Sequence, residues 1–168
     1  WLCAGRVAVE KSIEAFLKLD LPGTKIIAGD GPARASMQTK YPDAFWLGYK
    51  FGEELAKIYA DSDVFVFPSK TDTFGNVLLE SIASGTPVAA FPVPGPQDVL
   101  KPGVDGVLSE NLKDACLSAL RLDRDVVHRS SMDWDWDTCF QTFLSHLAPF
   151  DSDKFGYQFN KFESPTIL

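Results

Sequence analysis

The stretch FVFPSKTDTFGNVLLESIASGTPV, residues 65–88, joins three sequence patterns in one short segment. It begins with a fully apolar run of strand length, which ends at Pro68. The polar loop SKTDTFGN follows, and then Leu78, Leu79 and Ile82 recur at the spacing of one helix face. A buried strand that leads through a loop into an amphipathic helix is the basic unit of a parallel α/β sheet. We therefore expect this unit to lie at the centre of the fold.

The same alternation of short apolar runs and helical patterns extends over most of the chain. Most of the apolar runs lack a period of two, as expected for parallel strands that are buried on both faces. The predicted fold class is α/β, a Rossmann-like three-layer α/β/α arrangement around a mostly parallel sheet of about six strands. The predicted strands are residues 1–4, truncated at the start, and residues 25–28, 45–47, 63–67, 88–91 and 106–108.

After the last predicted strand, the sequence pattern is helical only. We expect helices over residues 112–122, 126–132 and 136–147, packed on the flank of the sheet. Residues 1–147 are thus predicted to form one domain. Residues 148–168 keep no period, and we leave them as an unassigned C-terminal tail. Because the chain opens without an initiator Met, we expect it to be part of a longer protein.

The composition excludes several classes of partner. The chain of 168 residues has a net charge of -7, whereas a nucleic-acid-binding domain needs positive charge to neutralise phosphates. It has no cluster of Lys and Arg suited to an anionic membrane, and no apolar run approaches the ~20 residues of a transmembrane helix. Three scattered cysteines without CxxC spacing predict neither a disulfide framework nor a zinc site. We therefore expect a cytoplasmic protein that binds no nucleic acid and has no membrane span.

Two carboxylates of the central segment are candidate ligands for a substrate. Glu80 lies on the polar side of the predicted helix, about one turn from its start, and Asp72 lies in the loop before it. Because ligands bind at the carboxyl ends of the strands in such sheets, both carboxylates are expected to line one cleft. The free backbone N–H groups around residues 74–77, at the start of the helix, suit phosphate or hydroxyl oxygens. The two carboxylates, as paired acceptors, suit a polyol.

Two cations, Arg6 and Lys11, follow the first predicted strand. A lysine near the start of a helix opposes the helix dipole by about 0.3–1 kcal/mol, unless an anion lies between them. A diphosphate would supply that anion, because Arg offers a bidentate fork and Lys a point charge. The pair therefore predicts a pyrophosphate-linked leaving group that is held without a metal ion.

In combination, these motifs resemble the carboxyl-terminal domain of glycosyltransferase family 4 enzymes, which have the GT-B fold. The resemblance rests on the central strand, the TDTFG loop, the acid-x7-acid spacing of Asp72 and Glu80, and the SGTPV that follows. It also rests on GRVAVEK at residues 5–11, GDGP at 29–32 and VPGPQD at 93–98, which fall in the family's order. The resemblance covers roughly residues 3–147. Asp72 stands where the family more often has Glu.

The resemblance implies a domain that holds a nucleotide-diphosphate sugar, with UDP or GDP, against a separate N-terminal acceptor-binding domain. It implies transfer of a hexosyl group to a lipid, glycan or small-molecule acceptor, with retention of configuration and without a metal or another cofactor. The acceptor domain is missing from this sequence, so we expect the fragment alone to be inactive and any contact with the inner face of a membrane to come from the missing part.

The resemblance also assigns the site residues. By analogy with the family, Arg6 and Lys11 hold the diphosphate, Glu80 holds the ribose hydroxyls, and Asp72 holds the donor sugar; these four are the candidate catalytic residues. The other donor-binding residues that we assign are Gly5, Gly29, Gly31, Thr73, Phe74, Gly75, Asn76 and Val77.

Simpler interpretations of these residues stay open. Glu80 also suits a solvated surface position, Asp72 a helix N-cap, and Gly29 a plain tight turn. His128 and His146 lie on separate predicted helices without spaced carboxylates or thiolates nearby, so no metal site is predicted. For the whole protein, the alternatives are a GT-B-type sugar-nucleotide epimerase and a non-catalytic nucleotide-sugar-binding or interaction module.

Overall fold

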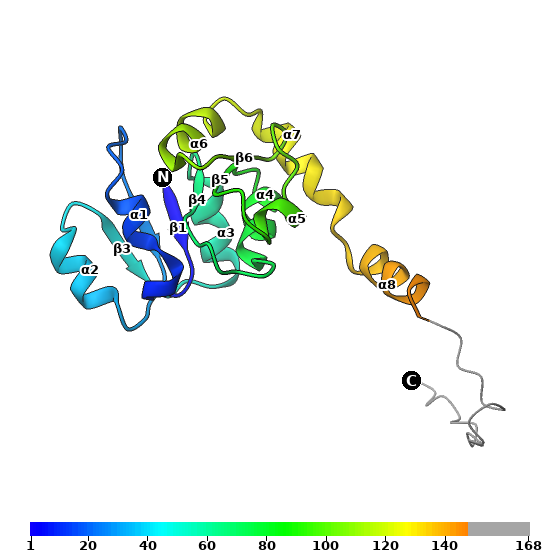
Figure 1. Ribbon diagram of the computed structural model, residues 1–168, viewed down its shortest axis with the longest axis horizontal. Helices are drawn as coiled ribbons and strands as arrows, with labels where there is room; N and C mark the ends of the chain where they lie inside the picture. Colours follow the sequence, from blue (N-terminus) through cyan, green and yellow to red (C-terminus); the bar gives the residue numbers. More distant parts are fainter. Residues whose placement is uncertain (148–168) are drawn as a thin grey trace, which may run out of the picture. The chain divides into compact units, whose positions relative to one another are not determined.

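The computed structural model describes residues 1–147, and its centre is a six-stranded sheet (Figure 1). The strands lie in the order β3-β2-β1-β4-β5-β6, and every neighbouring pair is parallel. Their bounds are β1 Leu2–Ala4, β2 Ile26–Ala28, β3 Phe45–Gly48, β4 Phe65–Phe67, β5 Val88–Ala90 and β6 Gly106–Leu108. The chain runs outward from β1 to β3 and then returns to the other side of β1, so the strand order reverses between β1 and β4. Ligands of open α/β sheets bind at such a reversal.

Helices cover both faces of the sheet, which explains why the strands are apolar throughout. Successive residues of β4 point to opposite faces: Val66 packs in one core cluster, and Phe65 and Phe67 pack in the other. β5 alternates in the same way, with Ala89 in the first cluster and Val88 in the second. A strand that is buried on both faces needs an apolar side chain at every position.

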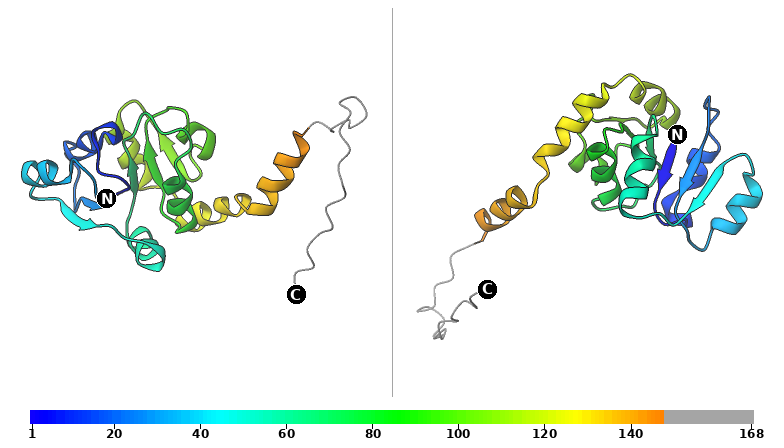
Figure 2. Two further views of the ribbon diagram at one scale, coloured as in Figure 1. Left: turned by 90° about the horizontal axis from the view of Figure 1, so that it is seen from below. Right: turned by 180° about the vertical axis from the view of Figure 1, so that it is seen from behind.

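The helices form a layer on each face of the sheet (Figures 1 and 2). The layer on the Val66 side contains α1 Ile13–Leu17, α2 Arg34–Lys40 and α6 Leu112–Ala119. The layer on the Phe65 side contains α3 Gly52–Ala60, α4 Asn76–Ala83, α5 Pro96–Val99 and α7 Arg124–Ser130. Short 3-10 helices follow β1 and α7, and these are η1 Val9–Lys11 and η2 Ser131–Asp133. The arrangement is a Rossmann-like three-layer α/β/α fold.

The predicted fold class is confirmed, and each of the six predicted strands lies within two residues of its observed limits. α7 packs against α4, and its Val127 belongs to the same buried cluster as Phe65 and Val88 of the sheet. Ser81, on the helix of the central segment, is fully buried. Its hydroxyl donates a hydrogen bond to the carbonyl oxygen of Thr86 at 2.7 Å, which satisfies the buried donor. A local hydrogen bond of this kind allows a polar residue on a core-facing helix position.

The chain's contacts divide it into a compact unit, Trp1–Trp134, and a second unit that begins at Asp135. In the second unit, α8 Trp136–Ser145 starts with an N-cap, because the Asp135 carboxylate accepts a hydrogen bond from the N–H of Thr138 at 2.6 Å. The predicted tail, 148–168, lies outside the described residues, and the predicted domain limit at residue 147 stays a prediction. Within residues 1–147, no helix has the length and apolar character that a membrane crossing needs.

Candidate active site

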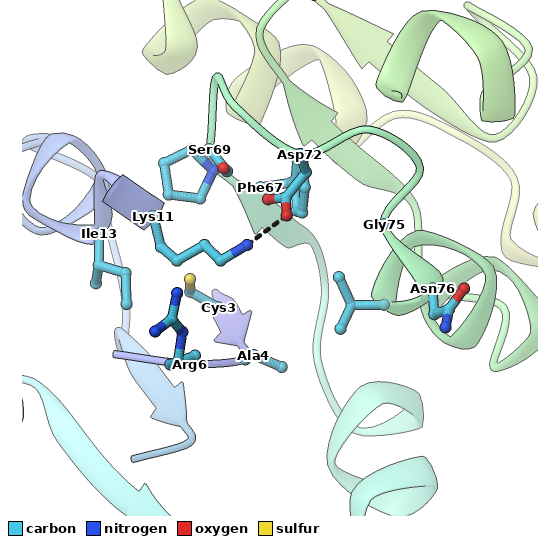
Figure 3. Close-up of a pocket in the computed structure, with 13 residues that line it drawn as sticks. Cys3, Ala4, Arg6, Lys11, Ile13, Phe67, Ser69, Asp72, Gly75 and Asn76 are labelled. Carbon is cyan, nitrogen blue, oxygen red and sulfur yellow. Dashed lines mark hydrogen bonds and ion pairs between the residues drawn. The ribbon is translucent and has the colours of Figure 1, made fainter. Parts of the chain in front are cut away.

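A cavity of about 300 Å³ lies at the carboxyl ends of β1 and β4, where the strand order reverses (Figure 3). This volume is at the lower end of the range for small-molecule sites, about 300–1,000 Å³. Cys3, Ala4 and Phe67 give it apolar walls, and burial raises the pKa of the Cys3 thiol to about 12, so this thiol is neutral at physiological pH. The polar groups of the cavity come from the turn after β1, the loop after β4 and the start of α4.

Arg6 and Lys11 lie on the same side of the cavity. Arg6 follows the turn at the end of β1, and Lys11 is the last residue of η1. Figure 3 shows both side chains directed into one space, with Asp72 beside the Lys11 ammonium. Lys11 forms an ion pair with Asp72, which is 61 residues away in sequence, and Arg6 forms an ion pair with Glu10. The structure therefore brings the two predicted cations and the first predicted carboxylate together.

Gly29 and Gly31 support the turn that carries Arg6. A Cβ atom on Gly29 would lie 1.9 Å from the carbonyl oxygen of Gly5, and one on Gly31 would lie 2.4 Å from that of Val7. Only glycine permits two backbone segments to approach so closely. Neither Gly29 nor Gly31 lines the cavity, whereas Gly5 does. The donor contact predicted for Gly29 and Gly31 stays a prediction, and in the structure both glycines pack against the backbone on either side of Arg6.

Asp72 reaches the cavity from the loop between β4 and α4. Its Oδ1 accepts a hydrogen bond from Lys11, while its Oδ2 is buried and accepts none from any residue in 1–147. Partial burial favours the neutral carboxyl, but the Lys11 ammonium, the nearby Ser69 hydroxyl and the charge of Arg6 outweigh it and hold the pKa of Asp72 below its ordinary value. Asp72 is therefore ionised at neutral pH, and within residues 1–147 only its Oδ1 has a hydrogen-bond donor. It does not cap α4, whose N-cap is Gly75.

Gly95, in the loop between β5 and α5, supports the Asp72 loop. A Cβ atom on Gly95 would lie 2.8 Å from the carbonyl oxygen of Asp72 and 3.4 Å from that of Phe74. Its φ of +87° also lies in the region that favours glycine. Sequence reasoning noticed this glycine only as part of the VPGPQD motif; its position between two prolines was the available signal.

The start of α4 supplies free backbone donors to the same cavity. Gly75 has φ 83° and offers no side-chain cap, and the first N–H bonded within the helix is that of Leu78, which donates to Gly75 at 2.9 Å. The N–H groups of Asn76 and Val77 thus have no acceptor inside the helix. Both residues line the cavity, and Figure 3 shows Asn76 across from Arg6 and Lys11. A helix start of this kind favours an anion.

The family comparison covers all of these segments. The family model described as "Glycosyl transferases group 1" matches residues 2–122, which include every residue that lines the cavity. The chain belongs to the glycosyl transferases group 1 family. The central segment of residues 65–88 in this glycosyltransferase family member supplies one wall of the cavity, as its strand, loop and helix pattern predicted.

Curated relatives of this group 1 glycosyltransferase chain are longer than the chain itself. The GDP-mannose-dependent alpha-mannosyltransferase of Mycobacterium tuberculosis is 41% identical over 106 residues, which cover 62% of this chain and 28% of that enzyme. The enzyme of the same name from Corynebacterium glutamicum is 33% identical over 157 residues, covering 86% of this chain and 38% of that enzyme. The chain thus spans well under half the length of these relatives.

Solved structures of other glycosyltransferases share the fold. The pneumococcal O-GlcNAc transferase GtfA, in complex with UDP and GlcNAc, matches with a TM-score of 0.67 at 23% identity over 86% of this chain and 34% of that one. AviGT4, a glycosyltransferase of avilamycin A biosynthesis, matches with a TM-score of 0.70 at 18% identity over 86% of this chain and 49% of that one. At these identities the likeness concerns the fold, which matches that of GT-B glycosyltransferases.

Glu80 of the group 1 glycosyltransferase chain lies beside the cavity rather than in its wall. It is exposed on α4, about 6 Å along the helix axis from Asn76. Its Oε2 accepts a hydrogen bond from the hydroxyl of Tyr59 at 3.2 Å, and Tyr59 belongs to α3. Glu80 therefore does not share the cavity wall with Asp72 as predicted, and a ligand must extend beyond the cavity to reach it.

Thr73 and Phe74 are exposed and also lie outside the cavity wall. The ring of Phe74 packs edge-to-face on Trp134, with 5.8 Å between the ring centres. This contact ties the Asp72 loop to the segment after α7. The donor contact predicted for the two side chains stays a prediction.

Sequence reasoning overlooked an aromatic pair at the carboxyl end of β3. The rings of Tyr49 and Phe51 stack with 5.8 Å between their centres and 12° between their planes. They are 59% and 74% exposed, respectively, so they form no part of the core. Two aromatic residues that flank Lys50 directly after an apolar run were the available signal. Exposed stacked rings at the ligand-binding edge of the sheet suit a flat aromatic ligand.

Within residues 1–147, no three His, Cys, Asp or Glu side chains are grouped so that they could hold a metal ion. His128 instead contacts the main chain, since its Nδ1 lies 2.7 Å from the carbonyl oxygen of Ala83. This histidine thus links α7 to α4.

Proposed function

We propose that this chain binds the sugar donor of a family 4 glycosyltransferase, a nucleotide-diphosphate hexose, and that the whole protein transfers the hexosyl group to a lipid, glycan or small-molecule acceptor. The main support is the convergence of Arg6, Lys11 and the start of α4 on one cavity at the switch point of the sheet. Two relatives are named for GDP-mannose, so GDP-mannose is the first donor to test. A UDP-sugar is the second, since GtfA was solved with UDP.

The diphosphate in this proposal lies between the two cations and the free N–H groups of Asn76 and Val77. Negative charge develops on the departing diphosphate during transfer, and fixed positive charge at that point lowers the barrier. The Asp72 carboxylate, which lines the cavity, accepts a hydrogen bond from a hydroxyl of the donor sugar. We further propose retention of configuration and no requirement for a metal or another cofactor, as the resemblance to family 4 enzymes implies.

The nucleoside extends from the cavity toward α3 and β3. Glu80 holds the ribose hydroxyls, and its Oε2 also accepts a hydrogen bond from Tyr59 of α3. The loop with Tyr49 and Phe51 precedes α3 and lies two strand spacings from β1, about 10 Å. A base that leaves the cavity along this edge reaches the two aromatic rings.

The acceptor in this proposal binds to another part of the protein. The chain covers 28% and 38% of two related mannosyltransferases, so a further acceptor-binding domain fits within the length of such enzymes. We place the whole protein in the cytoplasm, with any peripheral contact to the inner face of a membrane made by that other part.

A calorimetric titration of the full chain with GDP-mannose, UDP-glucose and inorganic pyrophosphate tests the proposal. We expect one of the two sugar nucleotides to bind. In Glu80→Ala, its affinity should fall about tenfold, because hydrogen bonds to a charged carboxylate are among the stronger ones. The affinity for pyrophosphate should stay the same, since Glu80 is assigned to the ribose.

Tyr59→Phe is the matched control, because it removes the Tyr59–Glu80 hydrogen bond and leaves the carboxylate in place. We expect its affinity for the sugar nucleotide to stay within about twofold of wild type. A wild-type chain that binds neither sugar nucleotide would contradict the proposed function. Equal binding by wild type and Glu80→Ala would remove Glu80 from the site.

A further inference from the structure

Both cations of the cavity are already paired with carboxylates before any ligand binds. Arg6 pairs with Glu10, and their side chains are 59% and 45% exposed. Lys11 pairs with Asp72, and these side chains are only 28% and 19% exposed. An entering diphosphate therefore competes with a carboxylate at each cation, and the better shielded of the two carboxylates is Asp72.

The two carboxylates differ in how easily they can move away. Glu10 lies in η1, four residues after Arg6, and its side chain is 45% exposed, so it has room to turn into solvent. Asp72 lies in a loop whose carbonyl oxygens pack on Gly95, so its backbone has no room to retreat on that side. Its Oδ2 is buried without a hydrogen-bond partner in residues 1–147. Asp72 is thus the more confined of the two carboxylates, and Glu10 is the more exposed.

A fixed carboxylate next to a diphosphate affects the binding of the intact sugar nucleotide and of the nucleoside diphosphate left after transfer differently. It repels the charge of both, and the repulsion is strong in a partly buried site. The intact donor carries sugar hydroxyls, which offset the repulsion by donating hydrogen bonds to the Asp72 carboxylate. The nucleoside diphosphate left after transfer carries more negative charge and has no sugar to donate.

We propose that Asp72 makes the site discriminate between the intact sugar nucleotide and the spent nucleoside diphosphate, by holding a fixed negative charge against Lys11. This inference rests on the proposed function and extends it to product release. Asp72 is in this sense a specificity-determining residue, because its charge weakens the binding of the product more than that of the donor.

Calorimetry of the full chain with GDP-mannose, GDP and inorganic pyrophosphate, or with the UDP pair if that donor binds, tests the inference. In Asp72→Asn, the affinity for the nucleoside diphosphate and for pyrophosphate should rise about tenfold, because one nearby negative charge is removed. The affinity for the sugar nucleotide should rise less or fall, because Asn offers fewer acceptor sites to the sugar. The ratio of donor to product affinity should thus fall, by about tenfold where the affinity for the sugar nucleotide is unchanged.

Glu10→Gln is the matched control, since it removes the same charge from the other ion pair of the cavity. In this variant, we expect the affinities for the sugar nucleotide and for the nucleoside diphosphate to change together, by about threefold or less, as for an exposed ion pair. If Asp72→Asn does not fold, as judged by its melting curve, Asp72→Ser makes the same comparison.

The outcomes separate the two proposals. A wild-type chain that binds neither nucleotide contradicts the proposed function, and the inference falls with it. A wild-type chain that binds both, with an unchanged ratio in Asp72→Asn, overturns the inference alone. A nucleoside diphosphate that binds Asp72→Asn no more tightly than wild type overturns it as well.

Discussion

Lys11→Met is expected to lower the affinity of the chain for a nucleotide sugar about 100-fold, the largest effect of any single change at the site. The substitution removes a charged hydrogen-bond donor to the diphosphate. It also leaves the partly buried carboxylate of Asp72 without its partner, so an uncompensated negative charge faces the ligand. Calorimetry with GDP-mannose or UDP-glucose measures the loss.

Lys18→Met is the matched control for this change. Lys18 is 63% exposed on the far end of α1 and pairs with Glu14 at 3.4 Å, so it has no contact with the cavity. The affinity of the Lys18→Met variant for the nucleotide sugar should stay within about twofold of wild type. Adding Asp72→Asn to Lys11→Met should restore part of the lost affinity, because the uncompensated charge is then gone. Wild-type affinity in Lys11→Met would mean that the diphosphate does not bind at this lysine.

Gly29→Ala is expected to destabilise the chain by about 3 kcal/mol or more, because the new methyl group overlaps the backbone. The Cβ atom would lie 1.9 Å from the carbonyl oxygen of Gly5, and φ at this residue is +154°. The turn that carries Arg6 must move or the β2 end must shift. A thermal melt followed by circular dichroism should show a midpoint lower by about 10 °C.

Gly103→Ala measures the cost of a positive φ alone, without a steric overlap. Gly103 also has a positive φ, +81°, but a Cβ atom there would meet nothing within 4 Å. We expect a loss of only about 1 kcal/mol in the free energy of unfolding. If the melting midpoint of Gly29→Ala were no lower than that of Gly103→Ala, the β2–α2 loop would not lie as close to the Arg6 turn as the structure shows.

The sheet was predictable from the sequence because its signal is local. Each strand is a short apolar run, and a fully buried strand such as β4 needs apolar residues on both faces. The positions of Arg6 and Asp72 at strand ends also followed from this pattern. The cavity itself could not be predicted from this local pattern. It depends on which strands are neighbours, and the strand order is a property of the whole sheet.

The pairing of side chains was harder to predict than their placement. The Lys11–Asp72 ion pair joins residues 61 positions apart, and no local period reports such a contact. The positions of Gly29 and Gly95 against other backbone segments depend on loop packing, which composition does not reveal. Glu80 was expected in the cavity wall with Asp72, but the helix carries it one turn further, to a hydrogen bond with Tyr59.

The most direct test of the account follows the backbone amide resonances of the full chain during a titration with GDP-mannose or UDP-glucose. We predict that the amides of Gly5, Arg6, Asn76 and Val77 shift together and saturate at one concentration, because one diphosphate lies between the β1 turn and the start of α4. Shifts confined to residues away from this cavity, or no shifts at all, would contradict the proposal that a nucleotide sugar binds where the strand order reverses.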